Sequence, residues 1–234
     1  MRVKLERRME ERKGSECERM RMMMYCMGDG SVSEMEMDEM KKEFNELLED
    51  LREIHSDFRV ISTEKVVVAE WVRWKCMFGC RAYGKHLNCP PYVPSIENTK
   101  NLISCYDIAI VARFKAEPNY EVTPSRIHHF LWDAIKNMYD KMFEMERHAF
   151  LSGYYKAFAL YAVPCAYCDP CIPEVEEDID HTAKRLCPFQ HKMRPSMEAT
   201  GIDVFQTVRN AGYKIKVLTS PYEDIFFFGL LLLE

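Results

Sequence analysis

Ten cysteines are the residues of this chain with the clearest capacity for chemistry, and seven of them fall into two tight sets. The later set consists of Cys165, Cys168 and Cys171, followed by Cys187 and Pro188. Three cysteines at three-residue spacing allow the chain to wrap around one inorganic core, and a later Cys-Pro supplies a fourth thiolate. We therefore predict that this four-cysteine group ligates one metal centre, a [4Fe–4S] cluster.

Zinc is the alternative metal for the four-cysteine group. Zinc also takes four thiolates in a tetrahedron, but its structural sites usually combine two separated Cys-x-x-Cys pairs. The first three cysteines match the start of the bacterial ferredoxin spacing, whereas the fourth comes later than it does there. The pattern favours iron–sulfur over zinc and leaves zinc open.

The earlier set, the three-cysteine group, consists of Cys76, Cys80 and Cys89. We predict a second metal centre here, with its fourth position open or filled by an exogenous ligand. Cys105 precedes a predicted strand, where a buried structural role is expected, and His86 is expected to face solvent. The alternatives are a structural zinc completed by His86, or a loop that binds no metal.

Charged and aromatic residues surround both groups. Arg81 and Lys85 lie inside the first motif, where they favour a negatively charged ligand or compensate the charge of a cluster. Together with the cations near Cys187, they also suit docking of an acidic redox partner, although ordinary surface charge explains them equally well. We expect Trp71 and Trp74 to shield a cluster from water.

The two motifs together carry a family resemblance. WKCMFGCRAYGKHLNCPPYVPS with CAYCDPC…CP…RPSMEATGIDV resembles a domain-of-unknown-function family described as predicted metal-binding proteins, found mainly in anaerobic archaea and bacteria. The resemblance runs from about residue 60 to the C-terminus. It implies iron–sulfur or related metal binding through the seven motif cysteines, and it brings no established reaction or substrate.

The N-terminal part of the chain reads differently from the rest. Residues 1–33 are charged and Met-rich without a periodic apolar face, so we expect a disordered tail. A later start, at Met35, Met37 or Met40, and a short exposed helix are the alternatives. From Ser33 onward, apolar residues recur at helical spacing, which predicts a helix that runs to Ile54 with an acidic outer face.

The remaining segments predict a single α/β domain over residues 34–234. Tyr106–Phe114 and Tyr155–Val163 read as strands on either side of a helix from Thr123 to Gly153, which predicts a parallel strand–helix–strand unit with a right-handed crossover. Further elements are expected as follows: a short helix at 95–102, a helix at 202–211, and a C-terminal hairpin of 214–219 with 224–233. We expect a mixed sheet with both cysteine groups in loops at strand ends.

Composition limits the function. The chain has 234 residues and a net charge of −5, which argues against a dedicated nucleic-acid binder. No apolar run approaches the roughly 20 residues that cross a bilayer, and the N-terminus does not resemble a signal peptide, so we expect a cytoplasmic protein without a membrane role. No glycine-rich nucleotide motif is present.

The sequence thus predicts an iron–sulfur protein with one or two [4Fe–4S] clusters, active in electron transfer or cluster-based catalysis in anaerobic metabolism, with a redox partner protein. The alternative is a non-catalytic interaction module that zinc or a cluster stabilises.

Overall fold

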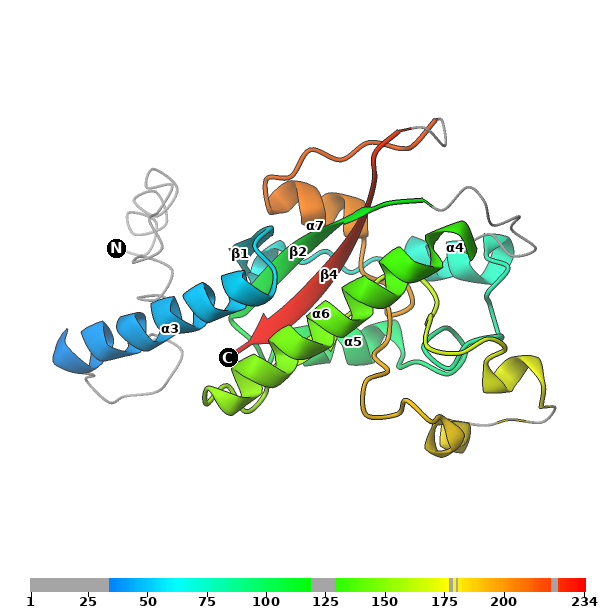
Figure 1. Ribbon diagram of the computed structural model, residues 1–234, viewed down its shortest axis with the longest axis horizontal. Coiled ribbons are helices and arrows are strands. Elements are labelled where there is room, and N and C mark those ends of the chain that lie inside the picture. Colours follow the sequence, from blue (N-terminus) through cyan, green and yellow to red (C-terminus); the bar gives the residue numbers. More distant parts are fainter. Residues whose placement is uncertain (1–33, 119–128, 177–178, 180, 220–222) are drawn as a thin grey trace, which may run out of the picture. The chain divides into compact units, whose positions relative to one another are not determined.

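The structure is a computed structural model that describes residues 34–118, 129–176, 179, 181–219 and 223–234 (Figure 1). The chain divides after Asp50 into two units, and the boundary lies inside helix α3, Glu34–Ile54. This helix confirms the first predicted element: Phe44, Leu47 and Leu48 are buried, whereas its acidic positions face solvent. The predicted tail over residues 1–33 lies outside the described residues.

A four-stranded sheet forms the centre of the second unit. Its strands are β1 (Phe58–Ser62), β2 (Ile108–Ala116), β3 (Phe158–Leu160) and β4 (Ile225–Leu233). Their order is β1-β2-β4-β3, and every neighbouring pair is antiparallel. The α/β class is confirmed, but the sheet is antiparallel instead of mixed. Because β2 and β3 both run antiparallel to β4, they share one direction as predicted, with β4 between them.

The C-terminal strand forms, but the predicted hairpin is wrong. Lys214–Thr219 contains no strand, and β4 pairs with β2 and β3 instead. The physical reason lies in the apolar run IFFFGLLLL, in which all residues but Phe226 are buried. A strand that is apolar on both faces is stable only where both faces are covered, and that favours the centre of the sheet.

Helices cover both faces of the sheet. Helix α6, Trp132–Leu151, packs on β2, β3 and β4 (Figure 1), and its methionine stripe at Met138, Met142 and Met145 is fully buried. Helices α5 (Ile96–Ile103) and α7 (Val204–Asn210) contribute to an apolar cluster with the alternate residues of the strands, which face away from α6. The start predicted at Thr123 lies outside the described residues; α6 itself begins at Trp132 and ends as expected near Gly153.

Helix α4, Glu70–Gly79, is the element that the sequence did not predict. It places Cys76 on a helix, whereas a loop was expected for the whole three-cysteine group. The four-cysteine group does follow a strand, β3, as predicted. Four 3₁₀ helices complete the described chain: η1 (Thr63–Lys65), η2 (His129–Leu131), η3 (Ile172–Glu174) and η4 (His181–Leu186).

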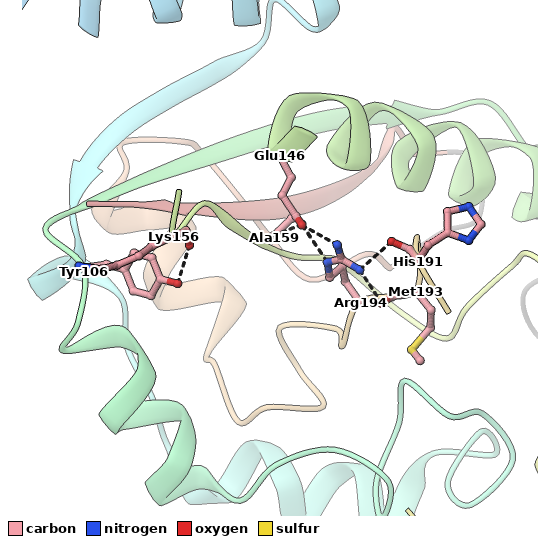
Figure 2. A network of polar contacts seen from close by, with 7 residues as sticks. All are labelled: Tyr106, Glu146, Lys156, Ala159, His191, Met193 and Arg194. Atoms are coloured by element: carbon pink, nitrogen blue, oxygen red, sulfur yellow. Dashed lines mark hydrogen bonds and ion pairs between the residues drawn. The ribbon is translucent and has the colours of Figure 1, made fainter. Parts of the chain in front are cut away.

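A polar network ties the segment after Cys187 to the sheet (Figure 2). Arg194 donates to both carboxylate oxygens of Glu146 on α6, and Glu146 Oε2 also accepts the Ala159 N–H of β3 at 2.9 Å. Arg194 Nη1 reaches the carbonyl oxygens of His191 and Met193 at 3.2 and 3.0 Å. Nearby, the Tyr106 hydroxyl donates to the Lys156 carbonyl at 2.7 Å.

Candidate metal centres

The three-cysteine group is assembled by a helix end and a loop that returns to it. Cys76 lies in the last turn of α4, and Cys80 ends the helix because its backbone is extended, with φ −94° and ψ 123°. The loop then closes on itself, since the Gly84 N–H donates to the Pro90 carbonyl at 2.9 Å. Gly84 has φ +71°, a conformation that glycine adopts without strain. Cys89 is thereby brought back toward the helix.

The thiols of this group lie within electrostatic range of one another. Burial raises the pKa of Cys76 to about 11, and the neighbouring Cys80 adds to the effect. Burial raises the pKa of Cys89 well above its usual value, and Cys80 and Cys76 raise it further. Each ionised thiol would repel the next, so a cation placed among them would be strongly stabilised.

The four-cysteine group lies in its own apolar surroundings. Cys171 and Cys187 are buried together with Leu87 in a small cluster apart from the main core, and Cys168 and Phe189 pack against it. Burial raises the pKa of both Cys165 and Cys168 to about 12, with further contributions from the other thiols of the group. The structure thus gathers these four cysteines from either side of η3 and η4.

The Asn88 side chain joins the two groups. It is completely buried, and its Oδ1 accepts the backbone N–H of Cys165 at 3.0 Å and faces the Cys89 thiol at 3.6 Å. Its Nδ2 donates to the Tyr139 hydroxyl at 2.8 Å and to the Val163 carbonyl at 3.2 Å. The first cysteine of one group and the last cysteine of the other therefore meet at one side chain.

Val163 and Glu198 form a second connection. Val163 has φ +54°, which is strained for a β-branched residue and is characteristic of functional sites. Its N–H donates to Glu198 Oε2 at 3.4 Å, and the Glu198 carbonyl lies 3.9 Å from the Cys76 sulfur. Burial raises the pKa of the Glu198 carboxyl, opposed by hydrogen bonds from the backbone and from Ser196.

Three expectations about neighbouring residues are wrong. Cys105 is exposed, and its thiol donates to the Asn101 carbonyl at 3.3 Å, because the turn after α5 directs it outward. His86 is buried, and its Nε2 lies 4.0 Å from Glu174 Oε1. Trp71 and Trp74 are 47% and 63% exposed on the outer face of α4, so neither shields the thiols from water.

The cations near the cysteines divide into two kinds. Arg81 and Lys85 are exposed, as an anion-attracting or docking role requires. In contrast, Lys192 pairs with Asp140 at 3.1 Å and Arg194 pairs with Glu146, so these two support the fold. Arg81 and Lys85 therefore keep the anion-attracting or docking role considered from the sequence, whereas Lys192 and Arg194 do not.

The thiol donors fit a thiophilic metal, although their side chains are not placed as metal ligands are. All eight described cysteines are free thiols. Within the described part of the chain, no group of three or more His, Cys, Asp or Glu side chains has the arrangement of a metal site. The thiols are gathered but do not converge on one point, as is usual for sites that become ordered when the metal binds.

Comparison with known families decides what kind of chain this is. The profile of one family, DUF2284, described as a predicted metal-binding protein, matches residues 59–233. The chain belongs to this family. The DUF2284 match includes both cysteine groups and every strand except the first residue of β1. No curated protein and no solved structure matches the chain.

The DUF2284 region also contains site residues that the sequence did not reveal. Hydrogen bonds between segments that lie far apart in the chain involve four such residues: Asn88, Tyr139, Val163 and Glu198. Val163 is in addition strained at its backbone. The one local signal was Asn88, an amide directly before Cys89. Among the described helices, none has both the length and the apolar character to cross a membrane.

Proposed function

We propose that this protein is an iron–sulfur protein that binds one or two [4Fe–4S] clusters and acts in electron transfer or cluster-based catalysis in anaerobic metabolism. The observation that carries the proposal is the proximity of four thiols: Cys168, Cys171 and Cys187 meet in or against a separate apolar cluster, and Cys165 lies within electrostatic range of all three. Three of the four are buried, and low solvent access is a property by which proteins tune a cluster's potential.

The three-cysteine group supports a different task from the four-cysteine group. Three thiolates leave one coordination position for a non-protein ligand, the arrangement that separates open catalytic sites from closed structural ones. Cys80 is exposed, and the exposed Arg81 follows it directly, so a small anion from solvent would meet a cation at this position. A redox partner protein belongs to the same proposal.

The test is anaerobic purification followed by visible absorption and analysis of iron, sulfide and zinc. We expect a broad visible charge-transfer band, as thiolate-bound iron–sulfur clusters give, with about four irons per cluster. Cys168→Ser should lower iron and sulfide, whereas the matched control Cys105→Ser should not, because Cys105 is exposed and outside both groups. A colourless protein with stoichiometric zinc would end the iron–sulfur proposal.

The second candidate is a metal-stabilised interaction module, and helix α4 is the observation that favours it. Trp71, Trp74, Met77 and Phe78 are 47%, 63%, 55% and 75% exposed, a concentration of apolar surface that is typical of binding faces. In this case zinc would hold the loops together. The metal analysis above separates the two candidates.

A further inference from the structure

We propose that Asn88 couples the two cysteine groups, so that metal binding at either group strengthens metal binding at the other. The proposal rests on the proposed function in one respect only: both groups must bind a thiophilic metal. It concerns Asn88 as a positioning residue and assigns it no contact with the metal.

The contacts of Asn88 make it a bridge between segments. Asn88 is the residue before Cys89, and its Oδ1 accepts the Cys165 N–H at 3.0 Å across 77 positions of the chain. Its Nδ2 holds the Val163 carbonyl, two residues before Cys165, at 3.2 Å. Asn88 therefore holds the backbone around Cys165, and it is also the residue directly before Cys89.

The burial of Asn88 makes this bridge hard to replace by water. Its exposure is 0%, and all of its side-chain polar atoms are engaged within the protein. A buried amide that loses one partner keeps the full cost of its desolvation, so the contact between the two segments is maintained as a unit.

Coupling follows from the placement of the thiols in both groups. In the described chain no three side chains of either group are placed as metal ligands are, so binding must draw the thiols of each group together and fix them there. When one group binds, the order imposed on Cys165 or Cys89 passes through Asn88 to the other segment. The second binding event then requires less ordering, which appears as positive cooperativity without a large change of structure.

Glu198 and Val163 add a parallel connection that Asn88 reinforces. The Val163 N–H reaches Glu198 Oε2 at 3.4 Å, and the Glu198 carbonyl lies near Cys76. This hydrogen bond is longer than the N–H···O bonds that Asn88 makes, and the connection ends at the half-buried Cys76. Asn88 is consequently the stronger of the two links.

Cobalt titration of the metal-free, full-length protein tests the coupling. Co²⁺ bound to thiolates gives charge-transfer and ligand-field bands, so it reports each group whether or not iron is the native metal. Cys80→Ser leaves the four-cysteine group intact, and Cys168→Ser leaves the three-cysteine group intact. Competition with a chelator provides the two affinities, and circular dichroism verifies that each variant is folded.

In the otherwise unchanged chain, we expect each serine variant to weaken cobalt binding at the other group by about fivefold or more, and by the same factor in both directions. In an Asn88→Leu background the two effects should fall below about twofold. Tyr139→Phe is the matched control: it removes a hydroxyl that contacts Asn88 but leaves the Oδ1 bond to Cys165, so coupling should persist.

Asn88→Asp keeps an acceptor oxygen at nearly the same volume but removes both Nδ2 donations, to Tyr139 and Val163, and it replaces Asn88→Leu as the test if that variant does not fold. In that case the reciprocal factor should fall below that of the unchanged chain, and a factor equal to that of the unchanged chain would overturn the proposal. Cobalt bands without reciprocal weakening, or coupling that survives in Asn88→Leu, would also overturn it while leaving metal binding in place. A complete absence of thiolate–cobalt bands would instead overturn the proposed function, and the coupling with it.

Discussion

Arg194 and Glu146 lie 48 positions apart in the chain and form a two-point ion pair, with Nε 2.9 Å from Oε2 and Nη2 2.5 Å from Oε1 (Figure 2). The two side chains are only 17% and 10% exposed. The pair attaches the chain that follows Cys187 to helix α6, and through Ala159 to β3. The segment that follows the four-cysteine group is thus attached to the sheet by an ion pair and by hydrogen bonds.

Glu146→Gln should destabilise the protein by about 3 kcal/mol, because it leaves the Arg194 guanidinium poorly compensated in a buried position. Glu144→Gln on the same helix is the control, since Glu144 pairs with Lys141 at side-chain exposures of 57% and 39%. Exposed pairs contribute about 1 kcal/mol or less. Urea unfolding of the metal-free variants measures both, and equal effects would contradict the structural role assigned to Arg194.

Metal binding should release protons and become tighter as pH rises. Burial raises the pKa of Cys76 to about 11 and that of Cys165 and Cys168 to about 12, so these thiols are protonated at neutral pH. Each thiolate ligand then releases about one proton. Calorimetry in buffers of different ionisation enthalpy counts them. An affinity that does not change between pH 6.5 and 8.5 would indicate ligands other than these thiols.

His55 should make the fold less stable in acid. Its ring stacks on Phe114 with centroids 4.0 Å apart, and its Nε2 lies 2.9 Å from the Arg113 carbonyl oxygen. Burial lowers the pKa of His55 below its usual value of 6.5. The unfolded chain therefore takes up the proton first, and the stabilisation present above pH 6.5 is lost as pH falls toward the folded-state pKa.

His55→Gln retains a donor for the Arg113 carbonyl but cannot titrate. The free energy of unfolding of this variant should fall less between pH 7.5 and 5.5 than that of the unchanged chain. Denaturant unfolding at both pH values provides the comparison. Parallel losses in the two proteins would mean that other groups account for the acid sensitivity.

Gly229→Ala should destabilise the core by roughly 1–3 kcal/mol, the usual effect of overpacking. A Cβ at this position of β4 would lie 2.5 Å from the Met142 sulfur, and Met142 is itself fully buried. The addition of Met142→Ala should make the double variant less destabilised than the sum of the single changes. Strict additivity would show that the two residues do not meet in solution.

Local patterns predicted most of the secondary structure. The long helix α6, the strand β2 and the short helix α5 were predicted in this way, because their patterns depend on residues close in sequence. The position of β4 between β2 and β3 does not depend on residues close in sequence. It results from pairing between residues at least 70 positions apart, which no local period encodes.

The candidate site divides in the same way. The spacing of the cysteines is visible in the sequence, and so is the presence of cations such as Arg81. Helix α4 was missed although Trp71, Trp74 and Phe78 recur at helical spacing, because the cysteine segment was interpreted as a loop. That these side chains face outward depends on packing that the pattern does not encode. The roles of Asn88 and His86 depend on burial by distant segments, and a single sequence does not contain that information.

The exposed face of α4 has a practical consequence for experiments. Two of the three tryptophans in the chain, Trp71 and Trp74, lie on the helix that carries Cys76, and the third, Trp132, begins α6. Indole fluorescence is quenched by nearby open-shell ions and shifts with solvent polarity. The protein's own tryptophan emission can therefore report metal binding at the three-cysteine group. In a Trp132→Phe variant, all of this emission would come from helix α4.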